Sequence, residues 1–179
     1  METRCVRGAV AYRLPEKWAV IHEVPVSIRF LWKRYGEQML TDFVVADPSE
    51  AEAVSSSTTR SSTWPCFESK GLDNSVLAAL WSALDPSADS SSLEGEKHLI
   101  FMKGKGGPWV FNVPSGLVAG LSVLSPSLLL QAAERWVEQP DLKRAGWRAL
   151  DVAPAIEALS AIASTAISEK KCLLLWMSL

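Results

Sequence analysis

A chain of 179 residues with 48% hydrophobic and 21% charged residues has the composition of a folded globular domain, which excludes a disordered or fibrous protein. Its net charge of −2 provides no overall positive field for a phosphate backbone, so we expect no nucleic-acid partner. Cys5, Cys66 and Cys172 are widely spaced and form no CxxC pair, and charges interrupt the apolar stretches of the first 30 residues. These features predict a reduced, cytoplasmic protein without an export signal.

The chain divides at about residue 38 into an N-terminal extension, 1–38, and a single domain, 39–179. The extension contains seven Lys or Arg residues and four Glu residues, a net charge of +3, which leaves −5 for the rest of the chain. Its loose alternation of apolar residues suggests short strands, followed by a helical or extended segment over 27–38.

The first part of the domain carries a strand and a helix start. A β-rich run over 41–46 predicts a strand, and Asp47-Pro48-Ser49-Glu50 supplies an N-cap, a proline at the first helical position and a glutamate at the third. The Ser/Thr-rich stretch 55–63 has too few apolar residues to form a core and is expected to be a surface loop.

A second helix and a hairpin follow. Asp73 is placed to cap a helix that ends at Asp85-Pro86, with apolar residues on one face. After a serine-rich loop over 87–92, the runs 98–102 and 109–113 predict a β-hairpin joined by a glycine-rich loop.

The last third of the chain predicts three helices and a strand. Helices are expected from residue 115, over 126–137 and from Asp151 to about residue 167, and the apolar run 172–177 is typical of a central strand buried on both faces. The uncharged stretch between Lys105 and Glu134 is long enough to cross a membrane, but its prolines and serines predict a strand and two short helices instead. We therefore expect an α+β fold in which four to five helices pack against a mixed or antiparallel sheet of about four strands.

The sequence contains no recognisable nucleophile and base, metal-ligand cluster or phosphate-binding loop. The strongest exception is Glu94-x-Glu96-x-His98, because these three side chains would share one face of a strand. This run supports an alternative function as a small metal- or ligand-binding enzyme. Without it, no cofactor or metal is expected and a non-enzymatic protein is favoured.

Six residues are candidates for a partner-binding surface. Trp64 and Trp147 lie beside loops, where tryptophan often anchors an interface, and four acidic residues gather along one loop region. The acidic residues would suit a basic partner. The predicted interface is Trp64, Asp85, Asp89, Glu94, Glu96 and Trp147.

Several landmarks of the domain resemble a group of small bacterial proteins, some encoded beside secreted polymorphic toxins and regarded as their immunity proteins. They are residues 43–47 with the following helix, 70–73, 109–114, 133–136 and 174–177. The group typically carries two acidic residues soon after the helix that ends near 136, where this chain has Glu138-Gln139-Pro140-Asp141.

The resemblance implies a cytoplasmic immunity protein that binds a cognate toxin with a basic active-site cleft and blocks it by occlusion. A housekeeping adaptor of the same fold, without a toxin partner, is the other binding function that the sequence leaves open. No membrane association is expected.

Overall fold

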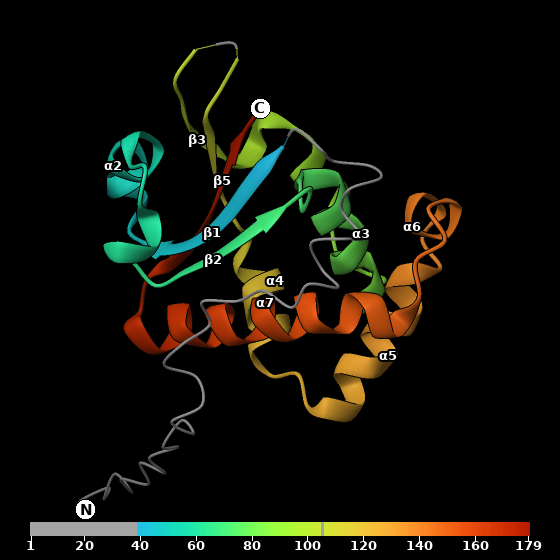
Figure 1. Cartoon of the computed structure of the whole chain (residues 1–179). Coiled ribbons are helices and arrows are strands. Elements are labelled where there is room, and N and C mark those ends of the chain that lie inside the picture. The colour runs from blue at the N-terminus through green and yellow to red at the C-terminus, as the bar shows by residue number, and fades with distance from the viewer. Residues whose placement is uncertain (1–38, 105) are drawn as a thin grey trace, which may run out of the picture.

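The computed structural model describes residues 39–104 and 106–179, and the N-terminal extension lies outside them. Five strands form one antiparallel sheet in the order β2-β1-β5-β4-β3 (Figure 1). The strands are β1 (Leu40–Ala46), β2 (Cys66–Lys70), β3 (Leu99–Met102), β4 (Trp109–Asn112) and β5 (Cys172–Ser178).

β5 lies in the middle of the sheet, as its unbroken apolar sequence predicts. It pairs with β1 through seven residue pairs, from Leu40 opposite Ser178 to Ala46 opposite Cys172, and with β4 on its other side. Residues 173–177 are all buried. A strand that is covered on both faces needs apolar side chains at successive positions, which explains the missing alternation.

Six α-helices are described, and four short 3₁₀ turns precede or connect them. The helices are α2 (Ala51–Ser56), α3 (Asn74–Leu84), α4 (Ser115–Ser122), α5 (Pro126–Val137), α6 (Pro140–Arg144) and α7 (Ala149–Glu169). The 3₁₀ turns are η3 (Pro48–Glu50), η4 (Arg60–Ser62), η5 (Ser90–Glu94) and η6 (Glu96–His98).

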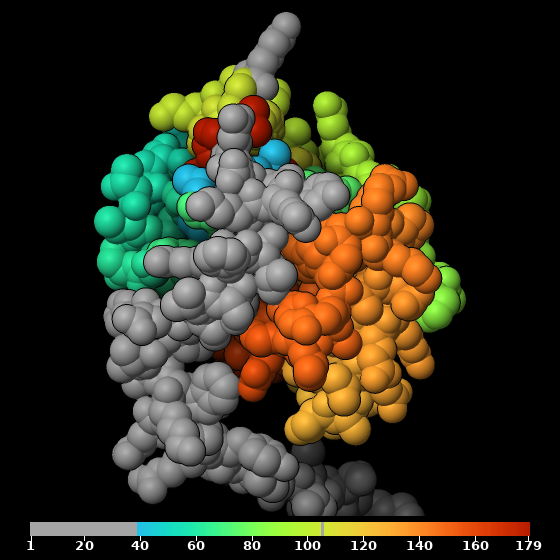
Figure 2. All heavy atoms as spheres, turned by 45° about the vertical axis from the view of Figure 1, so that its right-hand side comes forward, coloured from blue at the N-terminus to red at the C-terminus, as the bar shows by residue number. Residues whose placement is uncertain are grey.

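The two faces of the sheet pack against different layers. One face contributes Phe43, Phe111 and Leu175 to the main core, together with buried residues of α3, α4, α5, α6 and α7. The opposite face forms a smaller cluster in which Trp176 packs with Ala51 and Val54 of α2. In the space-filling view, α2 with η4 and α5 with α6 lie on opposite sides of the molecule (Figure 2).

Among the described helices, only α7 is long and apolar enough to cross a membrane by length and composition, with 21 residues and a mean hydropathy of 1.4. A core helix meets the same criteria. α7 buries Ile156, Leu159 and Ala163 in the main core, where it packs against α4, α5 and the sheet.

The α+β class is confirmed, as are the four predicted strands and the two helices α4 and α5 that divide the uncharged stretch. β2 was not predicted, and it adds a fifth strand to the expected sheet of about four. The prediction of a plain loop over 55–63 is wrong, because Ser55 and Ser56 end α2 and Arg60 begins η4 with a buried side chain.

Candidate binding groove along α3

α3 is fixed at both ends by its own sequence. The Asp73 carboxylate accepts the backbone N–H groups of Ser75 and Val76 at 3.0 Å each, which satisfies two N–H groups that lack partners within the helix. The helix buries Leu77 and Leu80 in the main core and ends at Asp85, whose backbone is extended. α3 therefore presents its other face to the surface.

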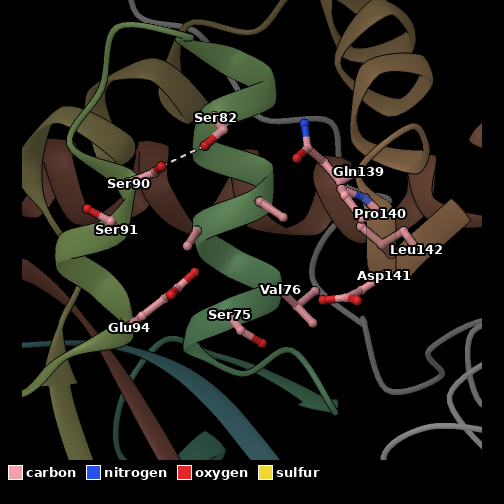
Figure 3. A pocket seen from close by; sticks show the side chains of 12 residues that line it. Ser75, Val76, Ser82, Ser90, Ser91, Glu94, Gln139, Pro140, Asp141 and Leu142 are labelled. Atoms are coloured by element: carbon pink, nitrogen blue, oxygen red, sulfur yellow. Dashed lines mark hydrogen bonds between the residues drawn. The ribbon is translucent and has the colours of Figure 1, made fainter. Parts of the chain in front are cut away.

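That outer face is occupied by small residues and forms the floor of a hollow. The hollow has a volume of about 270 Å³ and lies between η5 on one side of α3 and α6 on the other (Figure 3). It is lined by Ser75, Val76, Ala78, Ala79, Ser82, Ser90, Ser91, Glu94, Gln139, Pro140, Asp141 and Leu142.

A second hollow adjoins the first at Ser82 and Gln139, toward the end of α3. Its volume is about 610 Å³, and it is lined by Ser82, Ala83, Pro86, Glu134, Arg135, Glu138 and Gln139. We call the two hollows together the α3 groove. Because a helix rises about 1.5 Å per residue, the groove follows α3 for roughly 12 Å between Ser75 and Ala83.

Two polar contacts hold the walls of the groove to its floor. The Trp136 indole Nε1–H of α5 donates to the Val76 carbonyl oxygen of α3 at 3.2 Å, and the Trp136 side chain is fully buried. On the other wall, the hydroxyl groups of Ser82 and Ser90 lie 2.6 Å apart, which joins α3 to η5. The groove is therefore made by tertiary packing between segments far apart in the sequence.

Carboxylates outnumber cations among the lining residues. The two hollows together are lined by four carboxylates and one cation, Arg135; the carboxylates are Glu94, Glu134, Glu138 and Asp141. Glu94 and Asp141 stand on opposite sides of α3 (Figure 3).

Neighbouring cations pair with only some of these carboxylates. The Lys143 Nζ lies 2.6 Å from Glu138, and an Arg144 nitrogen lies 3.3 Å from Asp141. Both pairs are exposed, so each contributes little and separates readily. In the described part of the chain, Glu94 and Glu134 form no ion pair. The groove therefore offers negative charge, serine hydroxyl groups and some apolar surface, which suits a cationic segment with apolar side chains.

Two predicted acidic residues lie at the margin of the groove. The Asp85 carboxylate accepts the hydroxyl and the backbone N–H of Ser87, and these hydrogen bonds lower the pKa of Asp85. Asp89 pairs with Lys97 at 3.1 Å, and this hydrogen bond and charge lower the pKa of Asp89. Both side chains therefore remain ionised at neutral pH.

The structure brings some of the predicted interface residues together and separates others. Asp85, Asp89 and Glu94 lie along α3 and η5, and Trp147 follows α6, where its backbone N–H donates to the Leu142 carbonyl oxygen. Glu96 is exposed in η6 and does not line the groove.

Trp64 lies away from this group of residues. Its half-buried ring packs against the small cluster beneath α2, and its Nε1–H donates to Glu50 at 3.1 Å. The six predicted residues therefore do not form one continuous surface.

The structural premise of the metal alternative is wrong. Glu94 ends η5 and Glu96 begins η6, so Glu94, Glu96 and His98 do not alternate along a strand. The half-buried His98 ring lies 3.3 Å from the Ser92 hydroxyl. Within residues 39–104 and 106–179, no group of three His, Cys, Asp or Glu side chains is placed to hold a metal ion.

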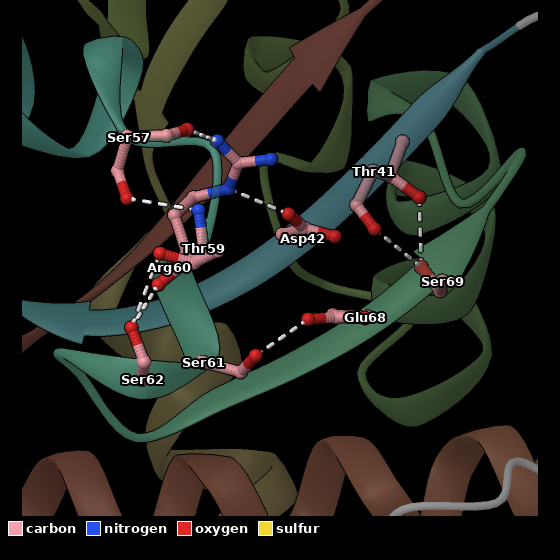
Figure 4. Close-up of polar contacts among 9 residues, drawn as sticks. All are labelled: Thr41, Asp42, Ser57, Thr59, Arg60, Ser61, Ser62, Glu68 and Ser69. Atoms are coloured by element: carbon pink, nitrogen blue, oxygen red, sulfur yellow. Dashed lines mark hydrogen bonds and ion pairs between the residues drawn. The ribbon is translucent and has the colours of Figure 1, made fainter.

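A second polar cluster lies on the opposite face of the sheet, beneath η4 (Figure 4). The Arg60 Nε–H donates to the Asp42 carboxylate at 2.6 Å, and a second Arg60 nitrogen donates to the Ser57 carbonyl oxygen. The Arg60 guanidinium also lies 3.5 Å from the centre of the Trp176 ring. Arg60 is thus held on three sides, and we assign this cluster a structural role in fastening η4 to the sheet.

Sequence reasoning missed Asp42, Arg60 and the carboxylates of α5 and α6. A carboxylate within the strand 41–46 was a usable signal, because a buried Asp requires a partner. Arg60 is the only charged residue between Glu52 and Glu68, which made it the nearest candidate. By contrast, nothing local in the sequence places Glu134 and Asp141 beside α3.

No family model matches the chain, and no curated protein or solved structure shows a significant similarity to it.

Proposed function

We propose that this chain is a non-enzymatic binding protein that holds a basic segment of a partner protein in the α3 groove. The observation that carries the proposal is the pair of adjoining hollows along α3, lined by four carboxylates and one guanidinium. The most concrete partner is a cognate bacterial toxin, as the resemblance of the domain to immunity proteins implies. Such a complex would block the toxin by covering its basic active-site cleft.

The charge distribution supports a basic partner. Residues 39–179 carry a net charge of −5, and the carboxylates at the groove lie on α5, α6 and η5, which approach α3 from different sides. Complementary charge of this kind accelerates encounter with a cationic surface and disfavours acidic competitors.

The rim pairs Glu138–Lys143 and Asp141–Arg144 are compatible with this binding mode. Their side chains are at least 65% exposed, so a partner cation can displace the intramolecular one without the cost of breaking a buried pair. The apolar side chains of Val76 and Leu142 supply the part of the groove against which the stem of a Lys or Arg residue could pack.

The proposal is tested by co-expression with the toxins encoded beside the gene. The protein should restore growth, co-purify with one toxin and bind it in isothermal titration calorimetry. Glu94→Gln with Glu134→Gln should weaken binding by about tenfold, since exposed ion pairs contribute about 0.2–1 kcal/mol each.

The matched control is Glu52→Gln with Glu157→Gln, which removes two exposed carboxylates from α2 and α7. Equal affinity of the groove variant and the control variant would remove the α3 groove from the proposal. Failure to restore growth or to co-purify with any neighbouring toxin would remove the immunity function.

A further inference from the structure

We infer that the α3 groove has an occupant within the same chain, namely residues 27–38. The inference rests on the proposed function only in that both use this groove. It predicts that the segment competes with any basic partner for the same surface.

The composition of the segment matches the groove. Residues 27–38 contain Arg29, Lys33 and Arg34 against Glu37, and their apolar residues are Ile28, Phe30, Leu31, Trp32 and Tyr35. The groove presents the opposite charge from Glu94 and Glu134, which form no ion pair within the described residues. It also offers apolar contacts through Val76, Pro140 and Leu142.

The point of attachment places the segment at one end of the groove. The Met39 carbonyl oxygen accepts the backbone N–H of Gly71 at 3.1 Å, and Leu40 pairs with Lys70. Gly71 precedes Asp73, the N-cap of α3, by two residues, and Ser75 lines the groove. Four residues of backbone, at most about 14 Å, therefore separate the attachment point from the floor of the groove.

The length of the segment is sufficient to follow the groove. Twelve residues span roughly 18 Å as a helix and about 40 Å when extended, compared with roughly 12 Å along α3 from Ser75 to Ala83. A ligand tethered this close has an effective concentration in the millimolar range. Weak contacts are then enough to keep the groove occupied.

Limited trypsin digestion of the full-length chain tests this docking. We would follow cleavage after Arg29, Lys33 and Arg34 by intact-mass spectrometry, comparing the parent with Glu94→Gln/Glu134→Gln, which neutralises the groove without adding a tryptic site. Docking predicts that the groove variant is cleaved about tenfold faster than the parent, equivalent to about 1.4 kcal/mol of docking free energy.

The control Glu52→Gln/Glu157→Gln should be cleaved at the parent rate. Equal rates in the parent and the groove variant would overturn the inference, as would equal acceleration in the groove and control variants. Circular dichroism establishes that each variant is folded before digestion.

A second measurement needs no substitution. A zero-length carbodiimide joins amines to carboxylates in direct contact, so docking predicts an amide between Lys33 and Glu94, Glu134, Glu138 or Asp141. Cross-links of Lys33 exclusively to carboxylates outside the groove would contradict docking. No toxin is present in either experiment, so a failure of docking leaves the proposed function untouched, and a failure to neutralise a toxin leaves docking untouched.

Discussion

Arg60 is the cation that fastens η4 to the sheet, and its contacts predict a strong energetic coupling with Asp42. Arg60→Met should lower the free energy of unfolding by about 3–5 kcal/mol, because it leaves a buried carboxylate unpaired. The double variant Asp42→Leu/Arg60→Met should lie within about 1 kcal/mol of the parent, since apolar pairs of similar volume often replace buried ion pairs without loss. Urea unfolding of the three variants measures the coupling. Additive losses would contradict the assignment of the pair as one unit.

Acid should reduce the loss of free energy of unfolding that Arg60→Met causes. Burial raises the pKa of Asp42 from its usual value of 3.8, although the hydrogen bond and charge of Arg60 oppose the rise. Because the folded-state pKa of Asp42 is raised, the protonated carboxyl group favours the folded state at low pH. That contribution to the free energy of unfolding is lost as the pH rises through the folded pKa. Once Asp42 is protonated, the absence of Arg60 no longer leaves a bare charge, so the difference in free energy of unfolding between variant and parent should shrink as the pH falls through the raised folded pKa of Asp42 toward 3.8.

The contribution of Glu50 to stability should change with pH in the opposite direction to that of Asp42. Its carboxylate accepts the Asp47 backbone N–H at 2.9 Å and the Trp64 indole N–H at 3.1 Å, and both hydrogen bonds lower its pKa below 4.5. The stabilisation is present above the unfolded pKa and is lost as the pH falls through the folded value.

The Trp64 indole proton resonance should therefore shift with a midpoint below pH 4.5 in an acid titration. Glu50→Gln should abolish that shift, whereas Glu52→Gln, at an exposed position of α2, should preserve it. A midpoint at or above 4.5 would contradict the hydrogen-bonded geometry.

At the scale of elements, α7 ends on a residue with a side chain, Lys170, in a left-handed backbone conformation that favours glycine. Lys170 has a φ of +56° and donates its backbone N–H to the carbonyl oxygens of Ala166 and Ile167. This conformation costs a residue with a side chain about 1–2 kcal/mol, whereas glycine adopts it freely. Lys170→Gly should therefore raise the free energy of unfolding by about 0.5–1 kcal/mol in urea titrations, after the entropic cost of glycine. Lys171→Gly, one residue later and without a positive φ, should not raise it.

The elements that were predictable from sequence are those with strong local signals. β5 has an unbroken apolar run, and α3 and α5 have caps where the structure shows side-chain hydrogen bonds. β2 was missed because it is an edge strand with Phe67 as its only buried residue, so its existence depends on pairing with β1. α6 was not predicted, although Pro140 at its first turn is a residue well suited to begin a helix.

The candidate groove was predictable only in part. Asp85, Asp89 and Glu94 stand close together in the sequence, so an acidic region was visible. Glu134 and Asp141 reach the same region because α5 packs against α3 and α6 packs against α5, which no local pattern encodes.

At the scale of the whole molecule, the separation of charge predicts a salt-dependent association. An acidic domain that captures a basic partner should lose association rate as salt is added, because exposed charges are screened over about 10 Å at 0.1 M and about 3 Å at 1 M. Stopped-flow measurements between low and high salt should show a steep fall in the association rate constant with a smaller change in the dissociation rate constant. A salt-independent association rate constant would indicate an apolar interface elsewhere.

The central position of β5 has a consequence for how the protein is made. β1 pairs with β2 and β3 pairs with β4, and β5 is the strand that joins these two pairs into one sheet. It is also the last of the five described strands to be synthesised. During translation, the inner edges of β1 and β4 have no neighbour until β5 has left the ribosome, and unpaired edges of this kind promote aggregation. The nascent chain is therefore expected to depend on chaperones that shield strand edges until β5 has emerged from the ribosome.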